Sequence, residues 1–204
     1  MISGSTTRFA SSGAPPRTLV LGLGNPLLAD DGVGLRVAQR VRSRLSERPE
    51  IEVGEDYCGG LRLMERMIGF DRAILIDARC SGAEPGTVCV LALDAAPGRH
   101  LASSHDVDLA TAIELGRRVG ASLPAIEDIR VVAIEAADVL TFREECTPPV
   151  RAAIEHAVDA VLSLLSAWGL EYHSRRDSVS PAEAGGAAPQ RPGETASVYP
   201  AASR

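Results

Sequence analysis

The sequence predicts an α/β protein with three layers, in which a mainly parallel, twisted sheet of about five strands is sandwiched between helices. Short runs of apolar residues, typical of strands buried on both faces of a sheet, alternate with segments whose apolar residues recur every three or four positions. Strands that alternate with helices form β-α-β units, which make neighbouring strands parallel and place helices on both faces of the sheet.

Three strands are predicted from runs of almost entirely apolar residues, which suit the centre of such a sheet. They span Thr18–Leu23, Ala73–Asp77 and Ile129–Ile134. Two further segments have weaker patterns and are predicted as strands at Ile51–Tyr57 and Thr87–Leu93. We expect the second of these at an edge of the sheet, because its alternation is poor and it follows the turn Glu84-Pro85-Gly86.

The helices are predicted from apolar residues that share one helical face. Val33, Val37, Val41 and Leu45 recur every four residues and predict an amphipathic helix that ends before Pro49. Three more helices are expected at Leu61–Ile68, from an opening at Ser103-Ser104 to Val119, and from about Pro148 to Ala167.

The length of 204 residues suits one domain with loose ends. Residues 1–16 are rich in Ser, Gly, Thr and Ala, and residues 170–204 form a low-complexity run rich in Ala, Gly, Pro and Ser. Such segments bury too little apolar surface to offset the entropy lost on ordering. We therefore expect a flexible N-terminal segment at 1–16, one folded domain at 17–169 and a disordered tail at 170–204.

The charge and hydropathy of the chain exclude several classes of protein. It has 21 basic and 27 acidic residues, a net charge of −6, whereas nucleic-acid-binding proteins normally present a basic face. No stretch approaches the roughly 18–20 apolar residues of a membrane span, and no apolar run near the N-terminus is typical of a signal peptide. The four cysteines form no C-x-x-C pair, which favours reduced, mostly buried thiols. We expect a cytoplasmic monomer that binds neither nucleic acid nor membrane.

The densest motif joins the first predicted strand to the first predicted helix. It begins Gly22-Leu-Gly24-Asn25-Pro26 and ends Asp30-Asp31-Gly32-Val-Gly34. A dinucleotide-binding fingerprint is excluded, because Leu27 stands where the third glycine belongs and two carboxylates would repel a phosphate. Aspartate is also a favoured helix N-cap, so we expect one of the two aspartates to cap the helix and the other to point at a ligand.

Two other polar residues stand where strands meet helices. Asp77 ends a buried strand, at the edge where parallel sheets collect ligands, although aspartates in that position more often cap a loop. His105 lies at a predicted helix start, where Ser103-x-x-Asp106 also fits a capping box. Two carboxylates and one imidazole form a ligand set for nickel or zinc with open coordination positions, unlike a closed structural zinc site.

Together these residues resemble the hydrogenase maturation endopeptidases. The resemblance runs from about Leu19 to Leu165 and rests on Gly22-x-Gly24-Asn25 with Asp30-Asp31-Gly32-x-Gly34, Ile76-Asp77-Ala78, Ser104-His105 and, more weakly, Cys146-Thr147-Pro148-Pro149-Val150. It implies a twisted sheet between helices and an enzyme that removes a C-terminal extension from the large-subunit precursor of nickel-iron hydrogenase once nickel is inserted.

The resemblance also implies which residues act. The metal-binding and catalytic positions of the family fall on Asp31, Asp77 and His105, with aspartate at the first position, where many members have glutamate. The nickel is expected to arrive with the precursor as a recognition element that fixes the scissile bond, and zinc or cadmium to replace it in vitro. The turn at residues 56–61 departs from the Gly-Gly-Thr-like turn of the relatives.

Two other functions fit parts of the sequence. Peptidyl-tRNA hydrolase has a similar Gly-Leu-Gly-Asn-Pro turn, but it is excluded because no histidine precedes His100 and the net charge is −6. A non-catalytic, nickel-sensing chaperone of the large subunit would use the same three ligands, so this alternative stays open. No Ser-His-Asp or Cys-His set offers a competing nucleophile.

Overall fold

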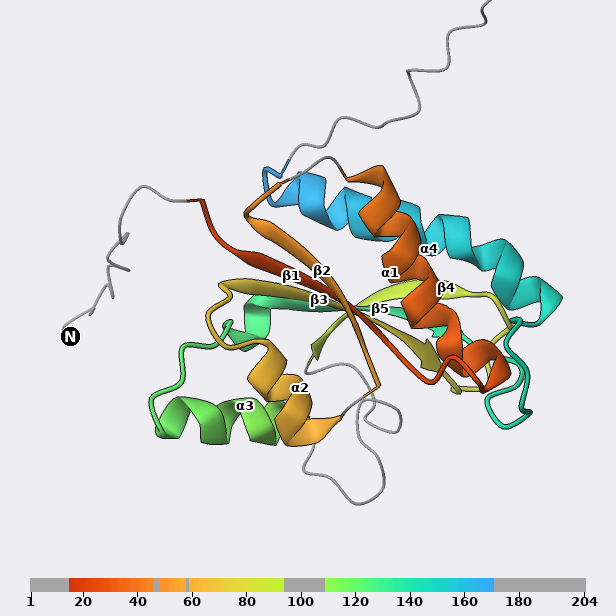
Figure 1. The fold of residues 1–204 in the computed structure, drawn as a ribbon, viewed down its shortest axis with the longest axis horizontal. Coiled ribbons are helices and arrows are strands. Elements are labelled where there is room, and N and C mark those ends of the chain that lie inside the picture. The colour runs from red at the N-terminus through yellow and green to blue at the C-terminus, as the bar shows by residue number, and fades with distance from the viewer. Residues whose placement is uncertain (1–14, 46–47, 58, 94–108, 171–204) are drawn as a thin grey trace, which may run out of the picture.

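Five strands form one sheet in the order β2-β1-β3-β5-β4 in the computed structural model (Figure 1). The structure describes residues 15–45, 48–57, 59–93 and 109–170. The strands are β1 (Thr18–Leu23), β2 (Ile51–Asp56), β3 (Arg72–Arg79), β4 (Val88–Ala92) and β5 (Ile129–Glu135). The pairs β1–β2, β1–β3 and β3–β5 are parallel, and β4 pairs antiparallel with β5 at the edge. The predicted sheet and its edge strand are therefore confirmed.

Helices cover both faces of this sheet, as the alternation of patterns predicts (Figure 1). The helices are α1 (Val33–Arg44), α2 (Gly60–Arg66), α3 (Leu109–Arg118) and α4 (Pro148–Ala167), with short 3₁₀ turns η1 (Ala29–Gly32) and η3 (Ile126–Asp128). One apolar core lies between the sheet and the pair α1 and α4, and a second lies between the sheet and the pair α2 and α3. Within the described residues, no helix is long and apolar enough to cross a membrane.

The alternation of side chains along the central strands assigns each residue to one core. In β3, Ile74 and Ile76 pack toward α1 and α4, whereas Ala73 and Leu75 pack toward α2 and α3. Asp77 continues the second row, so its carboxyl group leaves the sheet on the side of α2 and α3. Sheet pairing extends β3 two residues beyond Asp77, so the prediction that this residue ends the strand was wrong.

Helix α1 packs against β1 without intervening side chains. A Cβ atom added to Gly22 would lie 2.3 Å from the carbonyl oxygen of Gly34, and one added to Gly34 would lie 2.3 Å from the carbonyl oxygens of Leu23 and Ile76. These distances leave no room for any side chain, so both glycines are required. The close approach fixes the position of η1, which carries the two aspartates, relative to the carboxyl ends of β1 and β3.

The third predicted helix needs a correction at its end. Helix α3 stops at Arg118, and Val119 is 78% exposed instead of part of the apolar face. Gly120, with φ of 90°, follows at a position that a continuing helix cannot accommodate. The predicted opening at Ser103-Ser104 lies outside the described residues, as do nearly all residues of the predicted flexible ends.

Candidate active site at the carboxyl edge of the sheet

The loop after β1 folds back so that Asp31 lies beside the end of that strand. The Asn25 backbone N–H donates a hydrogen bond of 2.6 Å to Oδ2 of Asp31. Gly24 has φ of +124°, and a Cβ atom there would lie 1.8 Å from the carbonyl oxygen of Asp31. The Gly22-x-Gly24-Asn25 motif therefore makes the tight turn that brings Asp31 to the edge where parallel sheets bind ligands.

Asp77 is brought close to Asp31. Gly22 pairs with Ile76, so Asp77 lies level with the end of β1. Asp77 is 6% exposed, and among the described residues its carboxyl group accepts one hydrogen bond, of 2.8 Å, from the Ala78 backbone N–H. Burial and the nearby charge of Asp31 raise the pKa of Asp77 well above that of an ordinary aspartate, and the single hydrogen bond offsets this only in part.

No arginine compensates this pair of carboxyl groups within the described part of the chain, where neither aspartate forms an ion pair. Two neighbouring carboxyl groups without an arginine or lysine partner have the oxygen donors and the charge to bind a divalent ion. His105 lies outside the described residues, and no cluster of three metal-ligating side chains occurs among those that are described. The ligand set of three residues thus stays a prediction. The structure brings two of them, Asp31 and Asp77, close together.

Asp30 has a different role from the helix cap that the sequence suggests. It is fully buried, and its Oδ2 accepts hydrogen bonds from the backbone N–H groups of Ala137 (2.9 Å) and Asp138 (3.0 Å). Thr147 donates to the same carboxylate twice, from its backbone N–H (2.6 Å) and its hydroxyl group (2.9 Å). The N-cap of α1 is Gly32, with no side-chain cap, so neither aspartate caps that helix.

These four bonds attach η1 to the connection between β5 and α4. Thr147 is the N-cap residue of α4, so the Asp30 carboxylate also fixes where α4 begins. Backbone bonds add to the attachment, from Ala29 N–H to the Arg143 carbonyl (2.7 Å) and from Arg143 N–H to the Leu27 carbonyl (3.0 Å). The stretch Cys146-Thr147-Pro148-Pro149, a weak part of the family resemblance, thus forms hydrogen bonds to Asp30 of the densest sequence motif.

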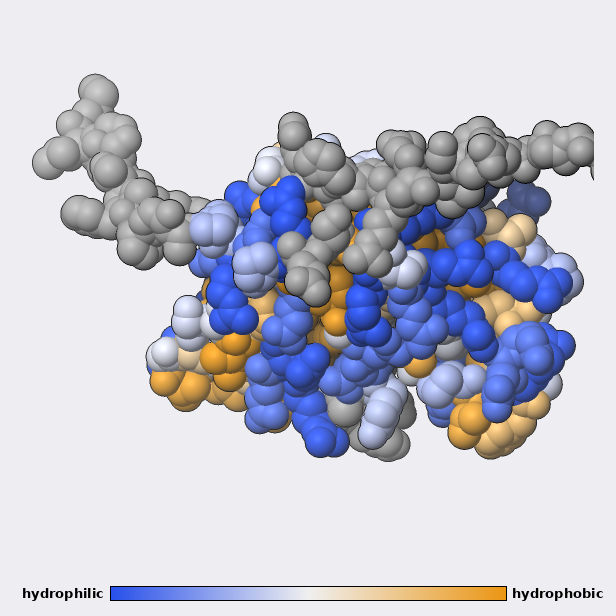
Figure 2. Space-filling model, turned by 45° about the horizontal axis from the view of Figure 1, so that its top comes forward, coloured by the Kyte–Doolittle hydropathy of each residue, from blue (hydrophilic) through white to orange (hydrophobic). Residues whose placement is uncertain are grey.

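The connection between β5 and α4 and the loop before η1 both expose apolar side chains. Leu140 and Phe142 are each 83% exposed, and Leu27 is 50% exposed. Figure 2, which brings the side of α1 and α4 forward, shows a mostly hydrophilic surface with hydrophobic areas at the lower left, in the centre and at the lower right, and the connection runs to the lower right in Figure 1. Apolar residues that are exposed on a hydrogen-bonded loop are typical of a surface that contacts another molecule.

A third buried carboxylate, Glu135, lies at the end of β5 and was missed by the sequence analysis. Glu135 accepts hydrogen bonds from the Ser81 backbone N–H and hydroxyl (2.6 and 2.7 Å) and from the backbone N–H groups of Gly82 and Ala83. Burial acts to raise the pKa of Glu135, but these bonds outweigh it and lower the pKa. The rule that selects Asp77, a carboxylate finishing a buried strand, also selects Glu135, so this residue had the same positional signal.

The carboxylates give this edge a negative potential that acts on Cys80. Burial first, then the charges of Glu135, Asp31, Asp30 and Asp77, raises the pKa of the Cys80 thiol, which makes it a poor nucleophile. Cys146 is buried and Cys89 half-buried, but Cys80 is exposed, so the expectation of buried thiols fails at this position. Cys58 lies outside the described residues.

Comparison with known proteins identifies the chain. The family model of hydrogenase maturation proteases, HycI, matches residues 35–164. The chain belongs to the hydrogenase maturation protease family. Hydrogenase 2 maturation protease of Escherichia coli K12 is 30% identical over 158 residues, which cover 76% of this chain and 94% of that protein. The hydrogenase expression/formation protein HupD of Rhizobium leguminosarum bv. viciae is 28% identical over 168 residues, 81% of this chain and 82% of that protein.

Solved structures of maturation proteases have the same fold. The hydrogenase maturating endopeptidase HybD from E. coli superimposes with a TM-score of 0.67 at 30% sequence identity, over 79% of this chain and 99% of that one. HycI from Thermococcus kodakarensis KOD1 superimposes with a TM-score of 0.56 at 19% identity, which concerns the fold alone. Membership of this maturation protease family makes the chain a protease, and therefore a hydrolase.

Proposed function

We propose that this protein is an endopeptidase that removes the C-terminal extension of a nickel-iron hydrogenase large-subunit precursor after nickel insertion. Asp31, Asp77 and His105 contact the nickel that the precursor carries, so the enzyme uses this ion to recognise a precursor that is ready for cleavage. Family membership supports the protease activity, and the acidic edge of the sheet supports the choice of residues. We further propose that the enzyme acts in the cytoplasm as a monomer.

The observation that carries the proposal is the uncompensated pair of carboxyl groups. Asp77 is buried, lies near Asp31 and has a raised pKa, an arrangement that costs stability when both groups are ionised. A nickel ion at this position would remove the repulsion, because hard carboxylate oxygens and an imidazole suit this metal. A nickel-free precursor would leave the repulsion in place, so the same pair favours the loaded substrate.

Nickel-loaded and nickel-free precursor, incubated with the purified protein and analysed by mass spectrometry, test the proposal. We expect loss of the C-terminal extension in the loaded sample alone. Binding without any loss of mass would contradict an endopeptidase and favour the nickel-sensing chaperone instead. Equal cleavage of both precursors would retain the protease and overturn nickel recognition.

Metal binding is tested separately by titrating nickel, or cadmium as a surrogate, into the isolated protein. We expect affinity to weaken as the pH falls, because protons compete for the carboxylates and the imidazole. The matched variants are Asp77→Asn, which removes one proposed ligand, and Asp159→Asn, which changes an exposed aspartate on α4. Equal affinities of the two variants would remove Asp77 from the ligand set.

A further inference from the structure

A cavity lined by residues of α1 and α4 contains basic side chains that the proposed cleavage does not use. It lies between α1 and the start of α4 and has a volume of about 360 Å³. Its lining consists of Arg36, Gln39, Arg40, Ser43, Glu145, Cys146, Arg151 and Ile154. This volume is within the range of pockets that bind small groups, roughly 300–1,000 Å³.

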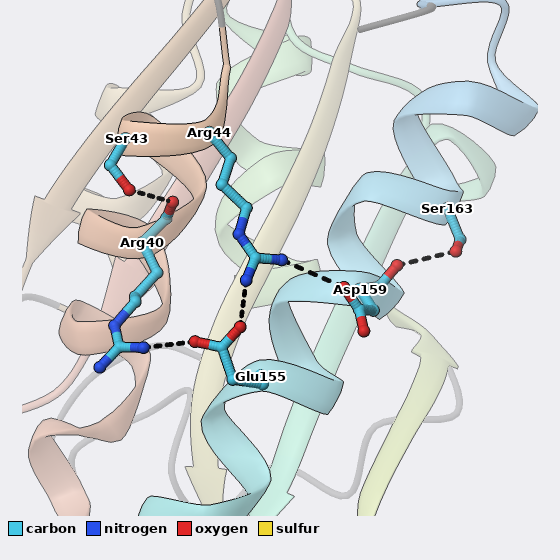
Figure 3. Close-up of polar contacts among 6 residues, drawn as sticks. All are labelled: Arg40, Ser43, Arg44, Glu155, Asp159 and Ser163. Atoms are coloured by element: carbon cyan, nitrogen blue, oxygen red, sulfur yellow. Dashed lines mark hydrogen bonds and ion pairs between the residues drawn. The ribbon is translucent and has the colours of Figure 1, made fainter. Parts of the chain in front are cut away.

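One of the three arginines in the cavity is already paired. Arg40 forms an ion pair with Glu155 of α4, which also pairs with Arg44, while Arg44 bonds Asp159 at 3.2 Å (Figure 3). Figure 3 shows these side chains bridging the two helices, with Arg40 directed at Glu155. The network fixes α1 to α4 at one side of the cavity, and its charges largely balance.

Arg36 has no such partner. It is half-buried, forms no ion pair with the described residues, and its buried Nε atom has no hydrogen-bond partner among them. Its guanidinium group lies against the Cys146 thiol, a weak acceptor. A buried guanidinium N–H without an acceptor costs free energy, so an anion in the cavity would satisfy a group that the fold leaves unsatisfied.

Arg151 provides a second positive charge on the first turn of α4. Its side chain is exposed, and no ion pair joins it to any other residue that the structure describes. Glu145 is the one acidic residue in the lining, against Arg36 and Arg151, which have no ion-pair partner among the described residues, so the cavity favours an anion. Arginine forks bind carboxylates in particular, because the two planar groups match.

The remaining lining indicates what kind of carboxylate fits. Ile154 and Cys146 are buried and give the cavity an apolar wall, while Gln39 and Ser43 add polar groups at its exposed side. An apolar wall beside arginines suits a short methylene chain that ends in a carboxylate, which is the side chain of glutamate. The Cys146 thiol also donates to the carbonyl oxygen of Ala29 at 3.7 Å, so this wall adjoins the turn that carries Asp30 and Asp31.

We infer that this cavity is a docking site for an acidic side chain of the substrate polypeptide, held by Arg36 and Arg151 while the scissile bond lies at the acidic edge. The inference rests on the proposed function for the identity of the substrate. The prediction that the cavity binds a carboxylate is independent of the proposed function, because a free dicarboxylate would bind to the same arginines. Opposite charges in the two places, arginines in the cavity and carboxylates at the edge, would also orient the polypeptide.

Glutarate, which carries the methylene chain and carboxylate of glutamate, tests the cavity without any cleavage. Isothermal titration is applied to the parent protein, Arg36→Gln, Arg151→Gln and the control Arg118→Gln, which changes an exposed arginine on α3 in the opposite layer. We expect glutarate to bind the parent and the control, and to bind each cavity variant about tenfold or more weakly, the usual effect of losing one charged hydrogen bond. Equal glutarate affinities in all four proteins, or no binding, would overturn the site.

Processing kinetics of the nickel-loaded precursor then identify the source of the carboxylate. We expect a raised KM with an unchanged kcat for both cavity variants, and competitive inhibition of the parent by glutarate. If glutarate binds but KM is unchanged, the site takes a free carboxylate and the docking proposal is wrong. If the parent protein does not cleave the precursor at all, the proposed function is wrong, but the titration still shows whether the cavity binds a carboxylate. Since Arg151 is exposed, its variant remains informative even if Arg36→Gln unfolds.

Discussion

Asp30 and Asp31 are adjacent in sequence, but their carboxylates lie in opposite environments. Asp30 is fully buried and accepts four hydrogen bonds from the connection between β5 and α4. Asp31 accepts a backbone hydrogen bond from Asn25 and lies near the buried Asp77, so two like charges are close together. Asp30 therefore stabilises the fold, whereas the charges of Asp31 and Asp77 repel each other in the folded protein. Such unfavourable electrostatics are typical of functional sites.

The largest effect is expected for Asp77→Asn, which should abolish processing and also raise the stability of the protein at neutral pH. The amide keeps an oxygen to accept the Ala78 N–H but carries no charge to be buried beside Asp31. Precursor processing and the Tm at pH 7.5 are the two measurements. A lower Tm with activity retained would make Asp77 a structural residue.

The pH dependence of this gain follows from the raised pKa of Asp77. Above a pH of about 4 the unfolded chain loses this proton while the folded protein keeps it, so the free energy of unfolding falls with rising pH. The loss is complete once the folded carboxyl group has ionised as well. The advantage of Asp77→Asn should therefore be large at pH 7.5 and shrink at pH 3.5.

Asp30→Ala should cause the largest loss of stability, about 3 kcal/mol or more, because it removes a fully buried carboxylate and leaves three part-buried backbone N–H groups without this acceptor. Urea unfolding measures this loss. Asp159→Ala is the control, since that carboxylate is 67% exposed and should contribute less than about 1 kcal/mol. A loss no greater than that of the control would show that Asp30 does not hold the connection.

Glu135→Gln should have a smaller effect, about 1–2 kcal/mol, because the amide oxygen still accepts some of the bonds from residues 81–83. The lowered pKa of Glu135 means that its stabilising contribution is present above a pH of about 4.5 and is lost as the pH falls through the folded pKa. Unfolding curves of the parent and the variant should converge on acidification. If the difference in unfolding free energy between the parent and the variant stayed constant from pH 7 to pH 3, Glu135 would not act as an ionised hydrogen-bond acceptor.

The smallest effect is expected for Asp138→Ala, because this carboxylate accepts backbone bonds from Leu140 (3.1 Å) and Thr141 (3.0 Å) in an exposed loop. Hydrogen bonds from Thr141 and Leu140 lower the pKa of Asp138 to about 2. Its contribution should therefore be complete above a pH of about 4 and be lost as the pH falls from about 4 through about 2. A Tm shift as large as that of Asp30→Ala would show that burial is not what distinguishes these two aspartates.

Much of the architecture was predictable because it depends on local patterns. Apolar runs located β1, β3 and β5, a period of four located α1, and the poor pattern of residues 87–93 correctly indicated an edge strand. The close approach of α1 to the sheet at positions 22 and 34, where only glycine fits, was found in the structure and was not predicted. Val119 was misplaced because hydrophobicity alone does not reveal where a helix ends.

The candidate site was predictable in part. A carboxylate near the carboxyl end of a central strand is a local feature, so Asp77 could be selected from the sequence. The same rule also selects Glu135, but it does not reveal that the Glu135 carboxylate accepts hydrogen bonds from Ser81 and Gly82. The partner of Asp30 could not be found from the sequence, because the bonded groups are 107 to 117 residues away and no local pattern connects them.

The sequence by itself determined which segments are strands and helices, their order, and the placement of acidic residues where the strands end, since each depends on neighbours along the chain. Only the tertiary structure decided that Asp30 is a buried hydrogen-bond acceptor, that Asp31 lies near Asp77, and that Arg36 lies in a cavity without an ion-pair partner among the described residues. Hydrogen bonds and burial depend on distances in space, and packing brings together groups that the chain keeps far apart.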